Sequence, residues 1–167
     1  IAGTDVAKEA SAMILTDDNF ASIVNAVEEG RNIYDNIKKF VFFLMSCNLA
    51  EVLILFTAIL IGFSDSSGKL IIPLVAIQIL WINLVTDGLP ALALSVEPAE
   101  GNVMVRPPRH PKESIFAYGL GIHAVWVGLL MGAVVLFIQA WSISTGHAHW
   151  QTMVFTVLFI TQLGHVL

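Results

Sequence analysis

The chain has 167 residues, of which 56% are apolar and 13% are charged, and its formal net charge is −5. Globular proteins average about 45–50% apolar and about 25% charged residues, so this composition, with a mean hydropathy of +0.79, excludes an ordinary soluble domain and indicates an integral membrane segment. The single cysteine, Cys47, excludes an internal disulfide and is interpreted as a small packing residue in an apolar run.

Residues 1–35 have the composition of a soluble segment. The short apolar run 12–15 favours a strand, and Asp17 and Asp18 follow it, immediately before an amphipathic helical pattern. We interpret these two acids as helix caps that complement the helix dipole rather than as metal ligands. Gly30 is expected to interrupt the helix before a charged lead-in to the membrane.

The next segment, 36–63, is almost wholly apolar and is long enough to cross a bilayer. Asn48 and Glu51 interrupt it at a spacing of three, which places both side chains on one side of a helix. A carboxyl group in the middle of a span is costly and usually functional. The structural alternative is a carboxyl held neutral by a hydrogen bond between helices.

A second span, 72–96, follows a short polar turn, so the two spans are expected to form an antiparallel hairpin. Three polar residues lie at helical offsets within it: Asn83, Thr86 and Asp87. Pro90 has no N–H to donate to the carbonyl of Thr86, and Gly88 loosens the same turn, so a kink is predicted. Carboxylate, amide, hydroxyl and carbonyl oxygens would then converge at membrane depth, which suits a hard cation. For Asp87, a hydrogen bond to a neighbouring helix is the structural alternative.

Residues 97–114 form a polar loop in which several prolines prevent helix formation. Seven of the eight Lys and Arg residues lie either in this loop or in the amino-terminal part of the chain. The positive-inside rule therefore predicts that residues 1–35 and 97–114 are cytoplasmic, and that the two short turns, 64–70 and 142–149, lie on the opposite side.

A third span is predicted over 115–141, where several glycines permit close helix packing, and its His123 is interpreted as a packing or interfacial residue. A fourth span is predicted over 150–167 and contains a further polar residue, Gln162. The sequence has no basic–aromatic patch for nucleic acid, no nucleotide-binding glycine loop and no nucleophile–histidine motif. We therefore predict a mainly α, polytopic membrane protein with about four transmembrane helices and no nucleic-acid partner.

The motifs of this chain, taken in order, resemble those of P-type cation-transporting ATPases of the calcium-pump branch. The run from GTDVAKEASA to NIKKF resembles the end of the phosphorylation domain and the stalk, and SCNLAEV and LWINLVTDGLPALAL resemble the fifth and sixth transmembrane helices. The RPPR loop beginning at Arg106 is similar to the connection between the sixth and seventh helices. The resemblance covers essentially the whole chain. It implies a membrane fragment holding helices five to eight of a pump in a bacterial plasma membrane.

The resemblance also implies a ligand set for a transported Ca²⁺ ion: Asn48, Glu51, Asn83, Thr86, Asp87 and Gln162. Pumps of the sarco/endoplasmic reticulum type carry a glutamate where Gln162 stands, so the neutral amide here puts a stoichiometry of two ions in doubt. Asn83 argues against the sodium–potassium branch, and Glu51 argues against the secretory-pathway manganese–calcium branch. The carboxylates of Glu51 and Asp87 would balance the charge of the ion and take protons after it leaves, which predicts proton counter-transport.

In this family the phosphorylated aspartate and the domain that binds ATP and Mg²⁺ lie upstream of the matching region. No catalytic or cofactor-binding residue is therefore expected in this chain, which by itself should be inactive. Its expected partners are the remaining helices and cytoplasmic domains of the same pump, together with the lipid bilayer. A pump for another cation such as Mn²⁺ or Na⁺, a passive channel and a proton-coupled carrier are the alternatives.

Overall fold

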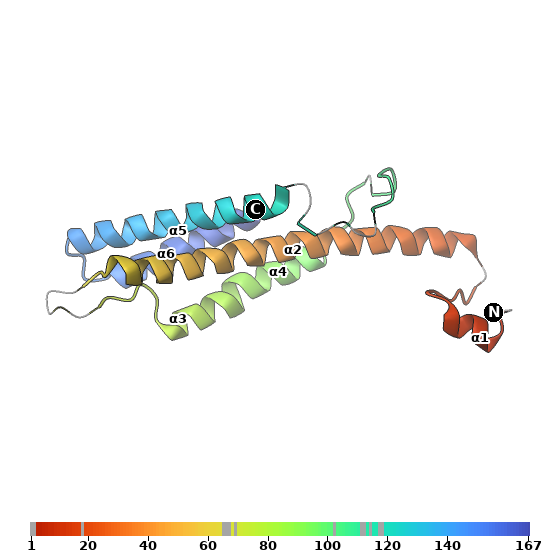
Figure 1. Cartoon of the computed structure of the whole chain (residues 1–167), viewed down its shortest axis with the longest axis horizontal. Helices are drawn as coiled ribbons and strands as arrows, with labels where there is room; N and C mark the ends of the chain where they lie inside the picture. The colour runs from red at the N-terminus through yellow and green to blue at the C-terminus, as the bar shows by residue number, and fades with distance from the viewer. Residues whose placement is uncertain are drawn as a thin grey trace.

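The computed structural model describes residues 3–17, 19–64, 68, 70–101, 103–110, 113, 115–116 and 119–167. Its helices, in chain order, are α1 (Asp5–Ala10), α2 (Phe20–Ile61), α3 (Ala76–Trp81), the π-helix η1 (Ile82–Asp87), α4 (Gly88–Ser95), α5 (Leu120–Ser144) and α6 (Trp150–Val166) (Figure 1). The prediction of a mainly α fold is confirmed. The run 12–15 is irregular rather than a strand, because none of the described segments lies beside it as a pairing partner.

The longest element is α2, a continuous helix of 42 residues that extends well beyond the rest of the bundle towards α1 (Figure 1). The prediction that Gly30 interrupts it is wrong: a single exposed glycine costs a helix only about 1 kcal/mol, which the rest of this long helix offsets. Asn19 is the N-cap and accepts a bond from the N–H of Ala21 at 3.0 Å, while Gly62 ends the helix with a φ of 71°.

Asp17 supports the start of α2 from just outside the helix, as the sequence suggested. Its carboxylate accepts hydrogen bonds from the Ser22 hydroxyl and from the backbone N–H of Asn19, and the bond from Ser22 is the main reason that the pKa of Asp17 is lowered. The other predicted cap, Asp18, lies outside the described residues.

Helices α4, α5 and α6 pack against α2, with α5 making the most extensive contact and α4 the next. In Figure 1, α5 and α6 lie on one side of α2, and the segment from α3 to α4 lies on the other. Two apolar clusters form the core, one around Phe43, Cys47 and Ala50, the other around Ile54. Glu51 lies between the two clusters along α2, and together with Thr86, Asp87 and Gln162 it forms a buried polar layer between the two apolar ones.

Among the described residues, three helical segments are long and apolar enough to cross a membrane: α2, Ala76–Ser95 and α5. The fourth predicted span, α6, has 17 residues and packs against α5. That α6 crosses the membrane stays a prediction. The second span begins as a helix only at Ala76, and the third begins at Leu120, later than predicted. Gly119, with a φ of 82°, precedes the first residue of α5.

The 97–114 loop is held against α2 through its polar side chains. Arg31 donates from Nη1 to the carbonyl oxygens of both Val103 and Arg106, each at 2.8 Å. Lys39 pairs with Glu97 at 2.8 Å and with Glu100 at 3.2 Å. Its hydrogen bond to Glu100 is the main reason that the pKa of Glu100 lies below the ordinary value.

Replacing Arg31 with Met should loosen this loop without unfolding the bundle. A hydrogen bond to a charged donor stabilises by about 1.5–3 kcal/mol, and partial solvent exposure reduces this to about 1 kcal/mol, so loop amides should exchange about fivefold faster. Hydrogen–deuterium exchange of the amides around Val103 measures the effect. Lys8→Met, on exposed α1, is the control. Unchanged exchange of the loop amides in Arg31→Met would contradict the role of Arg31 in holding the loop against α2.

Candidate cation-binding site

Glu51 is the residue at which three helices meet. Its side chain is 4% exposed, and each carboxylate oxygen accepts one bond from a different element. Asn83 of η1 donates from Nδ2 to Oε2 at 2.9 Å, and Gln162 of α6 donates from Nε2 to Oε1 at 3.2 Å. The predicted approach of the two spans is therefore present, with α6 as a third contributor.

Beside Glu51 lies a set of buried oxygens that have no hydrogen-bond partner among the described residues. Asp87 is 1% exposed and Thr86 is 2% exposed, yet both carboxylate oxygens of Asp87 and the hydroxyl of Thr86 are unpartnered. The Oε1 atom of Gln162, which is fully buried, is unpartnered as well. Buried polar atoms are usually satisfied, and leaving one bare costs about 1–3 kcal/mol. Four such oxygens near one carboxylate are the arrangement expected of a site that receives a cation.

The backbone of the second span is adapted at this level. The structure has a π-helix over Ile82–Asp87 between two α-helices, rather than an unwound kink. Pro90 has no N–H to donate to the carbonyl oxygen of Thr86. A Cβ atom added to Gly88 would lie 3.6 Å from the carbonyl oxygen of Asn83, five residues earlier. The break that the sequence predicted is thus a wider helical turn, a feature frequent at functional sites.

Asn48, a further predicted ligand, lies on the exposed side of α2. Its side chain is exposed, and its Nδ2 atom donates to the carbonyl oxygen of Leu44, one turn earlier on the same helix, at 2.8 Å. Asn83 is also exposed, although it is bonded to Glu51. The two asparagines therefore mark an open side of the polar layer, and the two carboxylates its buried side.

Cys47 belongs to this layer in a way that sequence reasoning missed. It is fully buried, as a packing residue would be, but it also interacts electrostatically with both Asp87 and Glu51. Its offset of four residues from Glu51 was the available signal, because that offset places two side chains one above the other on a helix. His123, in contrast, stacks on Phe42 with ring centroids 5.3 Å apart, which agrees with the packing role predicted for it.

Known proteins resemble this chain over nearly its whole length. A family model described as "Cation transporting ATPase, C-terminus" matches residues 71–167. The chain is 50% identical over 169 residues to a protein named "Calcium-transporting ATPase" from Bacillus subtilis (strain 168), an alignment that covers 99% of the chain and 18% of that protein. It is 47% identical over 184 residues to "Calcium-transporting ATPase 1" from Bacillus cereus (strain ATCC 10987 / NRS 248), covering 99% of the chain and 20% of that protein.

The chain thus spans about a fifth of the length of these relatives. Three helices of membrane-spanning length, a mainly α fold and a family match over more than half of the residues lead to one assignment. This multi-pass membrane chain belongs to the cation-transporting ATPase family, whose C-terminal membrane region it represents.

Proposed function

We propose that this chain is the C-terminal membrane part of an ATP-driven pump that exports Ca²⁺ from the cytosol, and that it supplies one share of the ion site. The observation that carries the proposal is the group of four unpartnered buried oxygens on Thr86, Asp87 and Gln162 beside Glu51. The names of the two relatives, both calcium-transporting ATPases, favour the same ion.

The donor chemistry fits a hard divalent cation. Calcium takes about six to eight oxygen ligands, and here carboxylate, hydroxyl and amide oxygens are available, with two carboxylates to balance two positive charges. In our proposal Asn83 and Gln162 donate to Glu51 and hold its carboxylate towards the ion. Asn48 would complete the shell from the open side, together with ligands from helices of the pump outside this chain.

We propose that the same two acids exchange the ion for protons. When Ca²⁺ leaves, Glu51 and Asp87 remain as two buried carboxylates that interact electrostatically with each other. Two like charges at short range in a poorly solvated site are unfavourable, so protons would replace the ion. Each transport cycle would then carry protons in the direction opposite to Ca²⁺.

The long helix α2 would couple this site to the rest of the pump. It runs without interruption from Phe20 to Ile61, so a movement at its first residues reaches Glu51 through one rigid element. We assign residues 1–35 and 97–114 to the cytoplasmic side of a bacterial plasma membrane. ATP and Mg²⁺ would bind other domains of the pump, so we expect this chain to be inactive by itself.

A cation titration of the full-length pump tests the proposal. ATP hydrolysis should be stimulated by micromolar Ca²⁺, and not by Na⁺; stimulation by Mn²⁺ at the same or lower concentration would assign the site to that ion instead. Current through a bilayer without ATP would indicate a passive channel, and transport driven by a proton gradient alone would indicate a carrier.

The amide at Gln162 predicts the stoichiometry. With a neutral ligand where related pumps carry a glutamate, we expect one Ca²⁺ bound per phosphorylated pump, measured by equilibrium binding of radioactive Ca²⁺. Gln162→Glu adds a buried negative charge and should raise that number or the affinity. Two ions bound by the unmodified pump would contradict the prediction.

A further inference from the structure

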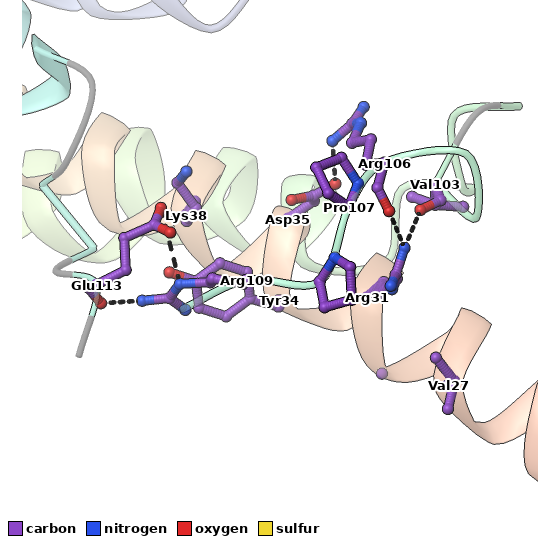
Figure 2. Close-up of a pocket in the computed structure, with 12 residues that line it drawn as sticks. Val27, Arg31, Tyr34, Asp35, Lys38, Val103, Arg106, Pro107, Arg109 and Glu113 are labelled. Carbon is purple, nitrogen blue, oxygen red and sulfur yellow. Dashed lines mark hydrogen bonds and ion pairs between the residues drawn. The ribbon is translucent and has the colours of Figure 1, made fainter. Parts of the chain in front are cut away.

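A second site lies outside the polar layer, on the side of the bundle that carries the 97–114 loop. A partly open cavity of about 520 Å³, here called the stalk cavity, lies between α2 and this loop (Figure 2). Its volume is in the range of about 300–1,000 Å³ that small-molecule sites occupy. The charged and aromatic side chains that line it are Arg31, Tyr34, Asp35 and Lys38 from α2, and Arg106, Arg109 and Glu113 from the loop.

The stalk cavity carries an excess of positive charge. Four cationic side chains line it, but only two acidic ones, Asp35 and Glu113. Asp35 pairs with Arg106 at 2.8 Å, and Glu113 lies 3.8 Å from Arg109. Both acids are therefore already matched.

The other two cations have no acidic partner among the described residues. Arg31 donates to two carbonyl oxygens. Lys38 lies over the ring of Tyr34, with its Nζ atom 5.8 Å from the ring centroid. Arg109 lies over the same ring, with its Cζ atom 4.1 Å from the ring centroid. The buried Tyr34 hydroxyl has no hydrogen-bond partner among the described residues. The cavity therefore offers positive charge and a hydroxyl to an anion.

A second cavity of about 260 Å³ adjoins the stalk cavity. The two share Asp35, Lys38 and Arg106. The second adds the ion pair of Lys39 and Glu100, and two apolar side chains, Phe42 of α2 and Leu120, the first residue of α5. Phe42 lies one turn beyond Lys38, where the apolar part of α2 begins. The second cavity thus lies between charged side chains and two apolar ones, at the point where the apolar part of α2 begins.

We propose that the stalk cavity binds the phosphate headgroup of an anionic phospholipid, with the acyl chains leaving past Phe42 and Leu120. A basic pocket immediately beside a transmembrane helix, on the side that carries most of the Lys and Arg residues, is where anionic headgroups are recognised. A soluble phosphate would satisfy the charge equally well. It would make no use of the apolar end of the second cavity, and this favours the lipid.

The bound lipid would act on the contact between the loop and α2. Lys38 belongs to the helix and Arg109 to the loop, and the two lie over the same aromatic ring. A phosphate held between them would add a bridge to the one made by Arg31. The lipid would therefore stabilise the docked loop.

The test measures lipid binding by the full-length pump and is independent of transport. The purified protein is delipidated, exposed to mixed vesicles of phosphatidylglycerol and phosphatidylcholine, and examined by native mass spectrometry for retained lipid. The unmodified protein should retain phosphatidylglycerol preferentially. Lys38→Gln should weaken retention about fivefold, the effect of one surface charge, whereas Lys38→Arg should preserve it. Lys8→Gln, an equal charge change on α1, is the matched control.

Three results would overturn the proposal. The first is an unmodified protein that retains both lipids equally, which needs no variant and no assumption about folding. The second is an equal loss in Lys8→Gln and Lys38→Gln, which would indicate general surface charge. The third is displacement of the lipid by millimolar inorganic phosphate or glycerol phosphate, which would assign the cavity to a soluble anion.

Discussion

Replacing Asp87 with Asn should lower the apparent Ca²⁺ affinity of the full-length pump by at least about 30-fold and abolish phosphorylation at micromolar Ca²⁺. The change keeps the shape of the side chain but removes one of two carboxylates from a buried layer. Losing one member of a buried charge pair costs about 2–5 kcal/mol, which corresponds to this loss or more. Phosphorylation by ATP over a series of free Ca²⁺ concentrations measures the effect.

The control for this prediction is Asp5→Asn, the same chemical change at an exposed position of α1. It should leave the Ca²⁺ dependence unchanged. The Asp87 variant should be no less stable to heat than the parent, because removing a buried charge without an ion-pair partner does not by itself destabilise a fold. A variant with normal stability and normal Ca²⁺ affinity would remove Asp87 from the ion site.

Replacing Gly128 with Val should destabilise the bundle by about 3 kcal/mol, the largest effect on stability that we expect from a single substitution. Gly128 of α5 is buried against α2: a Cβ atom there would lie 3.1 Å from Cδ2 of Leu49 and 3.2 Å from its Cβ and Cγ. The branched side chain would force the two helices apart. Thermal unfolding of the protein in a fixed detergent, at matched concentration, measures the change.

Two other glycines provide controls for this prediction. At Gly164, which is exposed, a Cβ atom would meet nothing within 4 Å, so Gly164→Val should change stability by less than about 0.5 kcal/mol. At Gly132, one turn beyond Gly128, an added Cβ atom would have the Cβ of Leu53 as its nearest neighbour, at 3.7 Å. Gly132→Ala should therefore be tolerated. Equal behaviour of Val at positions 128 and 164 would show that α2 and α5 do not approach this closely in the membrane.

Helical periodicity and polar interruptions predicted a large part of this architecture. The apolar runs around Glu51 and Asp87 predict two antiparallel spans. Because a short turn allows only one alignment of the two helices, the position of these two acids in the middle of their spans predicts the polar layer. Gly88 and Pro90 indicated that the second span would be irregular at the layer. That the irregularity is a π-helix depends on backbone hydrogen bonds, which residue spacing alone does not determine.

The orientation of individual ligands was harder to predict. Residues three apart on a helix differ by about 60° in direction, so Asn48 can be exposed while Glu51 is buried, and only the neighbouring helices decide between them. Cys47 lies directly one turn from Glu51, yet its position beside Asp87 required the packing of η1. Gly30 does not interrupt α2, because the continuity of a long helix outweighs a local preference of about 1 kcal/mol.

The π-helix determines how many residues can lie between α3 and α4 in the second span. Each turn of i→i+5 bonding holds about one residue more than a turn of α-helix, so α3 and α4 are out of phase by about 100° relative to a uniform helix. Ile79 packs against one apolar cluster and Leu94 against the other, and both contacts depend on this offset. A relative that lacks one residue within 82–87 would keep both contacts with a plain α-helix, but it would present a different side chain where Asp87 lies. Alignments of this segment should therefore place gaps at the π-helix and nowhere else in the span.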